Sequence, residues 1–238
     1  MYKRPRIGCK DIWNAFMCEG ARYSINDIPK CPTTSNSIPK RLILWDEAKA
    51  LYKREILHGN EDFLCDVFVC FYMDDYKFDG KDGVWNNPEK ALKILRHFSG
   101  VITPDFSTYQ DFPEPLKIYN TFRMRVWGYW IGKQGIQVIN NIRWGTPESW
   151  KYCWDGIPKN SIVAIGTVGG NPKKLVDRKR FNEGFYEMIR VLNPRAIVVY
   201  GSSNYEVFES ARNMGIEIYT YPSRTDTAFK RRKDDEQT

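Results

Sequence analysis

Long hydrophobic runs are absent from this sequence of 238 residues. A transmembrane helix needs roughly 18 or more consecutive apolar residues, and no stretch approaches that length. The first ten residues carry charges but lack the apolar run of a secretory signal. We therefore expect a cytoplasmic protein with no membrane partner, whose six cysteines are reduced thiols. Their spacing matches no zinc site, so we assign no metal to them.

Histidine is scarce, because His58 and His97 are the only two. This argues against histidine-rich zinc sites and conventional Ser-His-Asp triads. The Walker phosphate loop, the glycine-rich dinucleotide fingerprint and the DNA-reading helix or finger motifs are missing as well. These absences argue against several classes of active site and nucleic-acid-binding motif, but they do not decide whether the protein is an enzyme.

Positive charge is present in excess, and it is concentrated at the N-terminus. The formal net charge is +7, and residues 1–41 hold eight Lys or Arg against three acidic residues. A nucleic acid would meet this arm first. Its candidate phosphate contacts are Lys3, Arg4, Arg6 and Lys10. The alternative is a basic arm that is simply solvated, and the sequence does not choose between the two.

Short apolar runs alternate with helical patterns from residue 41 onward, which is typical of α/β proteins. Several runs are continuously apolar, as in residues 162–165, which indicates strands covered on both faces. We therefore expect a mainly parallel sheet of about seven strands. The predicted strands cover residues 41–45, 66–73, 100–103, 136–140, 161–166, 196–200 and 216–219.

Alternating strands and helices form either a barrel or an open doubly wound sheet. We favour a barrel-like, TIM-like arrangement, because the number of units approaches eight and the glycine-rich fingerprint is missing after the first strand. The chain is expected to divide into an irregular basic arm packed on the domain (1–40), a single α/β domain (41–222) and a charged tail (223–238).

In both architectures function gathers in the loops that follow the strands, and two of these loops supply acidic candidates. Residues 74–83 contain four aspartates. Hard cations such as Mg²⁺ bind several oxygen ligands, so a divalent cofactor and a solvated acidic turn are the two interpretations. Asp75 in this loop and Asp105 in the next are the candidate catalytic acids. Asp105 is alternatively a turn or helix cap.

The predicted helix 113–133 contains an anomaly. Steps of 100° place Arg123 inside the apolar stripe and Arg125 on the opposite side. A buried guanidinium needs a carboxylate, a phosphate or carbonyl groups. Asp105 or Asp75 could supply the carboxylate, in a structural or a catalytic pairing. The alternative is that Arg123 binds a ligand anion, and Asn120 is expected to share the site.

Two further loops carry candidate ligand-binding residues. Arg143 and Trp144 follow a strand and suit stacking on a base or sugar, although Trp144 is equally suited to closing one end of the core. The glycine-rich exit of the strand at 161–166 offers backbone amides to phosphate without matching a Walker motif. Its candidate residues are Thr167, Gly169, Gly170 and Lys173.

Four runs of residues carry a resemblance to a known family. They are GVITPDFSTY at 100–109, INNIRWG at 139–145, YCWDGIPKNSIVAIGT at 152–167 and VYGS at 199–202. Together they resemble the domain of unknown function 4417 family, over about residues 9–222. The resemblance implies an association with Gram-positive bacteria, their phages and mobile elements, and it implies no particular activity.

The sequence therefore predicts a phage- or mobile-element-associated protein with an anion-accepting cleft at the carboxyl ends of the strands, acting on a nucleotide or nucleic acid. In that hypothesis Asp75 and Asp105 hold a proton or a metal, and Arg123 and Arg143 neutralise phosphate. The alternative is a non-catalytic protein that sequesters a host protein or a nucleotide, or binds DNA through the basic arm. Glycoside chemistry by paired carboxylates is a third reading, based on fold analogy alone.

Overall fold

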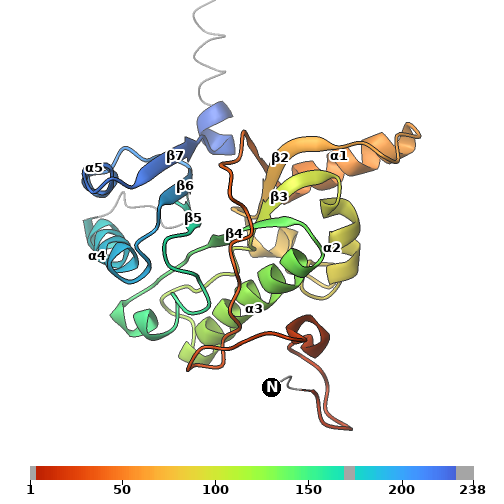
Figure 1. Ribbon diagram of the computed structural model, residues 1–238, viewed down its shortest axis with the longest axis horizontal. Helices are drawn as coiled ribbons and strands as arrows, with labels where there is room; N and C mark the ends of the chain where they lie inside the picture. Colours follow the sequence, from red (N-terminus) through yellow and green to blue (C-terminus); the bar gives the residue numbers. More distant parts are fainter. Residues whose placement is uncertain (1–3, 169–174, 229–238) are drawn as a thin grey trace, which may run out of the picture.

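A computed structural model describes residues 4–168 and 175–228 of the chain, and strands alternate with helices through it (Figure 1). The strands are β1 (Leu42–Leu44), β2 (Cys65–Cys70), β3 (Phe98–Ile102), β4 (Gln137–Asn141), β5 (Ile162–Gly166), β6 (Ala196–Tyr200) and β7 (Glu217–Tyr221). The α-helices are α1 (Trp45–Leu57), α2 (Pro88–Leu95), α3 (Glu114–Lys133), α4 (Leu175–Leu192) and α5 (Glu206–Asn213). Short 3-10 helices are η1 (Ala15–Cys18), η2 (Asp75–Lys77) and η3 (Pro147–Lys151).

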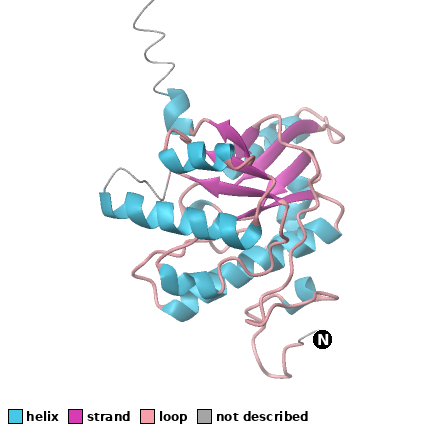
Figure 2. Ribbon diagram, turned by 60° about the vertical axis from the view of Figure 1, so that its left-hand side comes forward, coloured by secondary structure: helices cyan, strands magenta, loops and turns pink. Residues whose placement is uncertain are grey.

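The seven strands form one sheet in the order β1 to β7, and each strand pairs in parallel with the next one along the chain. A doubly wound sheet would reverse this order at a switch point. The sheet instead curls into a half-barrel (Figures 1 and 2). The predicted parallel, barrel-like α/β fold is therefore confirmed, and each predicted strand overlaps an observed one.

Apolar side chains cover both faces of the sheet, as the continuous apolar runs predicted. Because successive strand residues face opposite ways, Val163 and Ile165 pack outward among the helices while Ala164 lies on the inner face. The inner face is filled by the side chains of Leu44, Phe68, Cys70, Tyr72, Ile102, Ile139, Ile162, Ala164, Ala196, Val198 and Tyr200. The half-barrel thus has a packed interior.

The N-terminal arm covers the amino ends of the central strands. Thr34 donates its backbone N–H to the Val138 carbonyl at 3.0 Å and accepts the Val138 N–H on its hydroxyl at 2.8 Å. The Thr33 hydroxyl donates to the Ile162 carbonyl at 3.3 Å. Because the arm blocks this edge, the opposite edge, where the strands end, is the one left open for a site.

The first and last strands are tied together without being paired. Within the described residues no strand pairing joins β1 to β7. The Arg224 guanidinium, after β7, contacts both Asp46 carboxylate oxygens, at 2.6 and 3.0 Å, just after β1. The Tyr221 hydroxyl donates to the Pro39 carbonyl. These contacts limit how far the two edges of the half-barrel can separate.

No helix in residues 4–168 or 175–228 combines the length and the apolar character that crossing a bilayer requires.

Gly128 allows α3 to lie close against the sheet. A Cβ atom there would lie 2.4 Å from Thr103 Cγ2 and 2.8 Å from Cys31 Sγ. We expect Gly128→Ala to lower the free energy of unfolding by about 1–3 kcal/mol through overpacking. Urea denaturation measures the change, with Gly132→Ala as the control, since a Cβ there meets its nearest atom at 3.4 Å. An equal loss in both variants would contradict the close-packing explanation.

Candidate functional site

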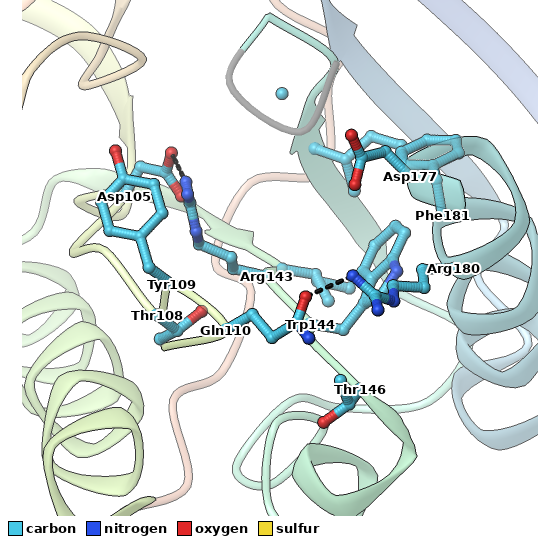
Figure 3. A pocket seen from close by; sticks show the side chains of 14 residues that line it. Asp105, Thr108, Tyr109, Gln110, Arg143, Trp144, Thr146, Asp177, Arg180 and Phe181 are labelled. Carbon is cyan, nitrogen blue, oxygen red and sulfur yellow. Dashed lines mark hydrogen bonds and ion pairs between the residues drawn. The ribbon is translucent and has the colours of Figure 1, made fainter. Parts of the chain in front are cut away.

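A pocket of about 290 Å³ opens where the central strands end (Figure 3). The loop after β3, the loop after β4, the end of β5 and the first turns of α4 each contribute part of its wall. The lining residues are Asp105, Thr108, Tyr109, Gln110, Ile142, Arg143, Trp144, Gly145, Thr146, Ile165, Gly166, Asp177, Arg180 and Phe181. This is the edge at which parallel α/β sheets generally carry their sites.

An ion pair between Asp105 and Arg143 forms one wall of the pocket. Arg143 Nη1 lies 2.5 Å from Asp105 Oδ2, and both side chains are largely buried, with 20% and 14% of their surface exposed. Asn141 Nδ2 donates to Asp105 Oδ1 at 2.8 Å, so both carboxylate oxygens are occupied. Burial disfavours the Arg143 charge, but Asp105, Tyr109 and Asp75 together outweigh this effect and raise the pKa of Arg143. The guanidinium also lies over the Tyr109 ring, at 5.5 Å.

Side chains of the half-barrel interior support this wall. The Tyr72 hydroxyl donates to Asn141 Oδ1 at 3.0 Å, and the Asn141 backbone N–H donates to Thr103 Oγ1 at 2.8 Å. The Tyr72 ring stacks on Tyr200 at 5.1 Å. Burial raises the pKa of Tyr72 well above its ordinary value, so its hydroxyl keeps its proton and acts as a donor. Asn141 is thereby fixed in the orientation that holds Asp105.

The opposite wall comes from α4. Asp177, Arg180 and Phe181 line the pocket from this helix, and Arg180 Nη1 donates to Gln110 Oε1 across it (Figure 3). Trp144 lies against the same helix, because Gly184 leaves room for its indole. A Cβ atom on Gly184 would lie 2.1 Å from Trp144 Cδ1.

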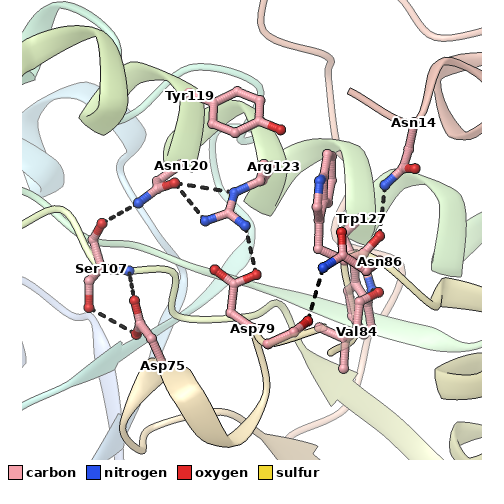
Figure 4. Close-up of polar contacts among 12 residues, drawn as sticks. Asn14, Asp75, Asp79, Val84, Asn86, Ser107, Tyr119, Asn120, Arg123 and Trp127 are labelled. Carbon is pink, nitrogen blue, oxygen red and sulfur yellow. Dashed lines mark hydrogen bonds and ion pairs between the residues drawn. The ribbon is translucent and has the colours of Figure 1, made fainter. Parts of the chain in front are cut away.

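Arg123 lies in a second polar cluster beside the pocket (Figure 4). It is buried, as its place on the helix predicted. Its carboxylate partner is Asp79, at 2.7 Å, and the expectation of Asp105 or Asp75 is wrong. The chain turns back after η2 and brings Asp79 to α3, whereas Asp105 is already paired with Arg143. Asn120 shares the site as expected, since its Oδ1 accepts from Arg123 Nη2 at 2.7 Å.

Asp75 connects this cluster to the pocket loop. Ser107 donates its hydroxyl to Asp75 at 2.9 Å and its backbone N–H at 3.2 Å, while its carbonyl accepts from Asn120 Nδ2. Burial raises the pKa of Asp75 above its ordinary value, and the two Ser107 hydrogen bonds oppose that rise. Asp75 thus holds the loop of residues 103–112, which carries Asp105.

Arg125 lies on another side of α3 from Arg123, as the spacing predicted, and this side is buried as well. Its side chain is fully buried, and its three donor nitrogens contact the backbone carbonyls of Asn141, Cys153 and Asp155 at 2.9–3.1 Å. It joins α3 to the end of β4 and to the segment after η3. This arginine is therefore a structural crosslink beneath the pocket.

Other predicted residues fall outside the pocket. Thr167 is buried and donates to the Ser202 carbonyl at 3.0 Å, which braces two adjacent loops. Arg4, Arg6 and Lys10 are exposed on the arm and do not line the pocket, so their role in binding nucleic acid stays a prediction. Lys3, Gly169, Gly170 and Lys173 lie outside the described residues.

The aspartates of residues 74–82 do not form a shared site. Asp74 pairs with Lys77 at 3.2 Å, Asp79 pairs with Arg123, and Asp75 accepts from Ser107. In the described part of the chain no three His, Cys, Asp or Glu side chains are grouped for a metal ion. The divalent cofactor therefore stays a prediction without a ligand set.

Several pocket residues were missed at the level of sequence. They are Thr108, Tyr109, Gln110, Asp177 and Arg180. A signal for two of them was available, because α4 begins at the edge where β5 ends. Charged residues in the first turns of such a helix lie beside the strand ends, where the sites of α/β proteins gather.

Fold and pocket together define an α/β half-barrel protein with a polar pocket at the carboxyl ends of its strands. The chain belongs to the domain of unknown function (DUF4417) family, whose model matches residues 21–222. The resemblance seen in the sequence motifs is thereby confirmed.

Two phage proteins are similar to this chain. The gene 1 protein of Mycobacterium phage D29 is 33% identical over 236 residues, which cover 98% of this chain and 80% of the phage protein. The gene 1 protein of Mycobacterium phage L5 is 35% identical over 131 residues, or 55% of this chain and 56% of that protein. The expected association with phages is confirmed by these relatives. No solved structure matches the chain.

Proposed function

We propose that this phage-associated protein binds a nucleotide in the pocket at the carboxyl ends of β3, β4 and β5. The observation that carries the proposal is that a guanidinium group of α4, Arg180, lines the pocket beside two aromatic rings. A second guanidinium, Arg143 after β4, lines it as well but is already paired with Asp105. Guanidinium groups match the geometry of phosphate oxygens better than any other side chain.

Aromatic rings in the pocket favour a ligand with a planar part. Tyr109 and Trp144 both line it, and Tyr109 has about half of its surface exposed. Any nucleobase can stack on such rings, because every base has a flat aromatic face. A ligand that carries both a phosphate and a base fits this combination of walls.

The contacts that Asp105 and Asp75 already make favour a binding protein over an enzyme. Asp105 accepts from Asn141 and pairs with Arg143, so a substrate proton on either oxygen would have to compete with the Arg143 charge or the Asn141 hydrogen bond. Asp75 is the better candidate for an acid, since its pKa is raised, but both of its oxygens accept from Ser107. A binding protein that sequesters a nucleotide is therefore the form of the proposal that we favour.

Isothermal titration calorimetry with Arg180→Met tests the proposal. We expect this variant to weaken the binding of a nucleotide at least about tenfold, because it removes a charge-assisted contact. Lys179→Met removes the same charge from the neighbouring, exposed position of α4 and should leave binding unchanged. Equal affinities for the two variants, or no binding of any ribonucleotide or deoxyribonucleotide by the native protein, would contradict a nucleotide site in this pocket.

A further inference from the structure

We propose that the ligand carries a single phosphate, and that this phosphate replaces Gln110 as the hydrogen-bond partner of Arg180 when the ligand binds. The inference rests on the proposed nucleotide site and assigns a separate role to each wall of the pocket. Arg180 receives the phosphate, whereas the Asp105–Arg143 pair faces the uncharged part of the ligand. The ligand class is then a nucleoside monophosphate.

The partners of the two guanidinium groups distinguish their roles. Arg143 is already neutralised by Asp105 at 2.5 Å, and a phosphate placed on it would approach the same carboxylate. Within the described residues, Arg180 donates to the side-chain amide of Gln110, which is neutral. A hydrogen bond between two charged groups is roughly twice as strong as one to a neutral partner. An incoming phosphate therefore gains more by displacing Gln110 than by competing with Asp105.

Thr108 supplies a second donor. Within residues 4–168 and 175–228 its buried hydroxyl oxygen has no hydrogen-bond partner, and the residue lines the same pocket (Figure 3). Buried hydroxyl groups in folded proteins are nearly always hydrogen-bonded. Because this oxygen has almost no accessible surface, a ligand oxygen would satisfy it only after the loop that carries Thr108 shifts. Thr108 and Gln110 belong to one loop, so the same small adjustment that releases Arg180 accommodates a ligand beside Thr108.

Charge and size limit the number of phosphates. Among the residues that the structure describes, the charged side chains that line the pocket are Asp105, Arg143, Asp177 and Arg180, two of each sign. A triphosphate would bring several negative charges next to the two carboxylates. The pocket volume, about 290 Å³, is just below the range of about 300–1,000 Å³ for small-molecule sites. Asp177 instead suits a hydroxyl group of the ligand, as carboxylates do in dinucleotide sites.

The number of phosphates can be tested by calorimetric titration of the native protein. The probes are the 5′-monophosphates and 5′-triphosphates of the four ribonucleosides and four deoxyribonucleosides, together with inorganic phosphate. We expect at least one monophosphate to bind about tenfold or more tightly than its triphosphate and than inorganic phosphate. A triphosphate that binds as tightly as its monophosphate, or more tightly, would overturn the inference while leaving the nucleotide site in place.

Gln110→Glu tests the displacement. The new carboxylate would neutralise Arg180 in the same way that Asp105 neutralises Arg143, so we expect monophosphate binding to weaken about tenfold. Gln110→Ala removes the competing amide and should bind as tightly as the native protein or up to severalfold more tightly. Native affinity in Gln110→Glu would overturn the assignment of the phosphate to Arg180. Tight triphosphate binding, or native affinity in Gln110→Glu, would overturn only this inference. If the native protein binds no nucleotide at all, the proposed function itself is contradicted.

Discussion

Replacing Arg125 with methionine is expected to lower the free energy of unfolding by about 3 kcal/mol or more, since each hydrogen bond from a charged group contributes roughly 1.5–3 kcal/mol. Methionine fills much of the volume but leaves three buried carbonyls, those of Asn141, Cys153 and Asp155, without a donor. Burial lowers the pKa of Arg125 to about 10, which shows that the surroundings disfavour its charge. The three carbonyl contacts are what make the buried guanidinium tolerable.

Urea denaturation at neutral pH measures this loss. The matched control is Arg96→Met, since Arg96 is exposed at the end of α2 and should change the free energy of unfolding by less than about 0.5 kcal/mol. Arg125→Lys should fall between the native protein and Arg125→Met, because an ammonium group keeps the charge but cannot span three separate carbonyls. A loss in Arg125→Met no larger than in Arg96→Met would show that the three contacts contribute nothing to stability.

The burial of Arg125 could not be predicted from the sequence, because α3 is buried on more than one side. The helix contacts β4 on one face and η1 of the arm on another. Stepping residues at 100° divides a helix into an inner and an outer face, which suits a helix at the surface. Arg123 and Arg125 point in different directions, and each meets a buried environment. The spacing therefore placed the two arginines on different sides of the helix but identified only Arg123 as buried.

The strands were easier to predict than the contacts among loops. Continuous apolar runs such as residues 196–200 arise wherever a strand is covered on both faces, and this local signal located the strands to within a few residues. Curvature of the sheet depends on twist accumulated over all seven strands, which no single run encodes. The number of repeating units and the missing glycine-rich fingerprint accordingly favour a barrel-like arrangement, but they do not predict that the barrel is only half closed.

The candidate site was predicted in outline for a similar reason. Asp105 and Arg143 were each placed after a strand, and their strands turned out to be neighbours, β3 and β4. Their pairing requires the register of those strands and the support of Asn141, both of which are tertiary features. Asp79 neutralises Arg123, but the sequence alone gives it no role. The reason is that composition does not predict where a loop places its side chains.

The Asp105–Arg143 pair gives the second large effect. Arg143→Met is expected to lower the free energy of unfolding by about 2–4 kcal/mol, because removal of one partner leaves the other as an uncompensated, largely buried charge. The Asp105 side chain is 14% exposed, so water screens it little. Asp105→Asn alone should destabilise the protein similarly, since it leaves the Arg143 guanidinium unpaired.

The double variant separates charge from packing. Asp105→Asn with Arg143→Met removes both charges, so its loss should be smaller than the sum of the two single losses by about 1–3 kcal/mol. Urea denaturation of the four proteins of this cycle measures the coupling. If the phosphate binds at Arg180, the double variant should still bind a monophosphate more tightly than Arg180→Met does, because its Arg180 guanidinium is intact. If the two single losses simply add in the double variant, the 2.5 Å contact between Asp105 and Arg143 contributes nothing to the free energy of unfolding.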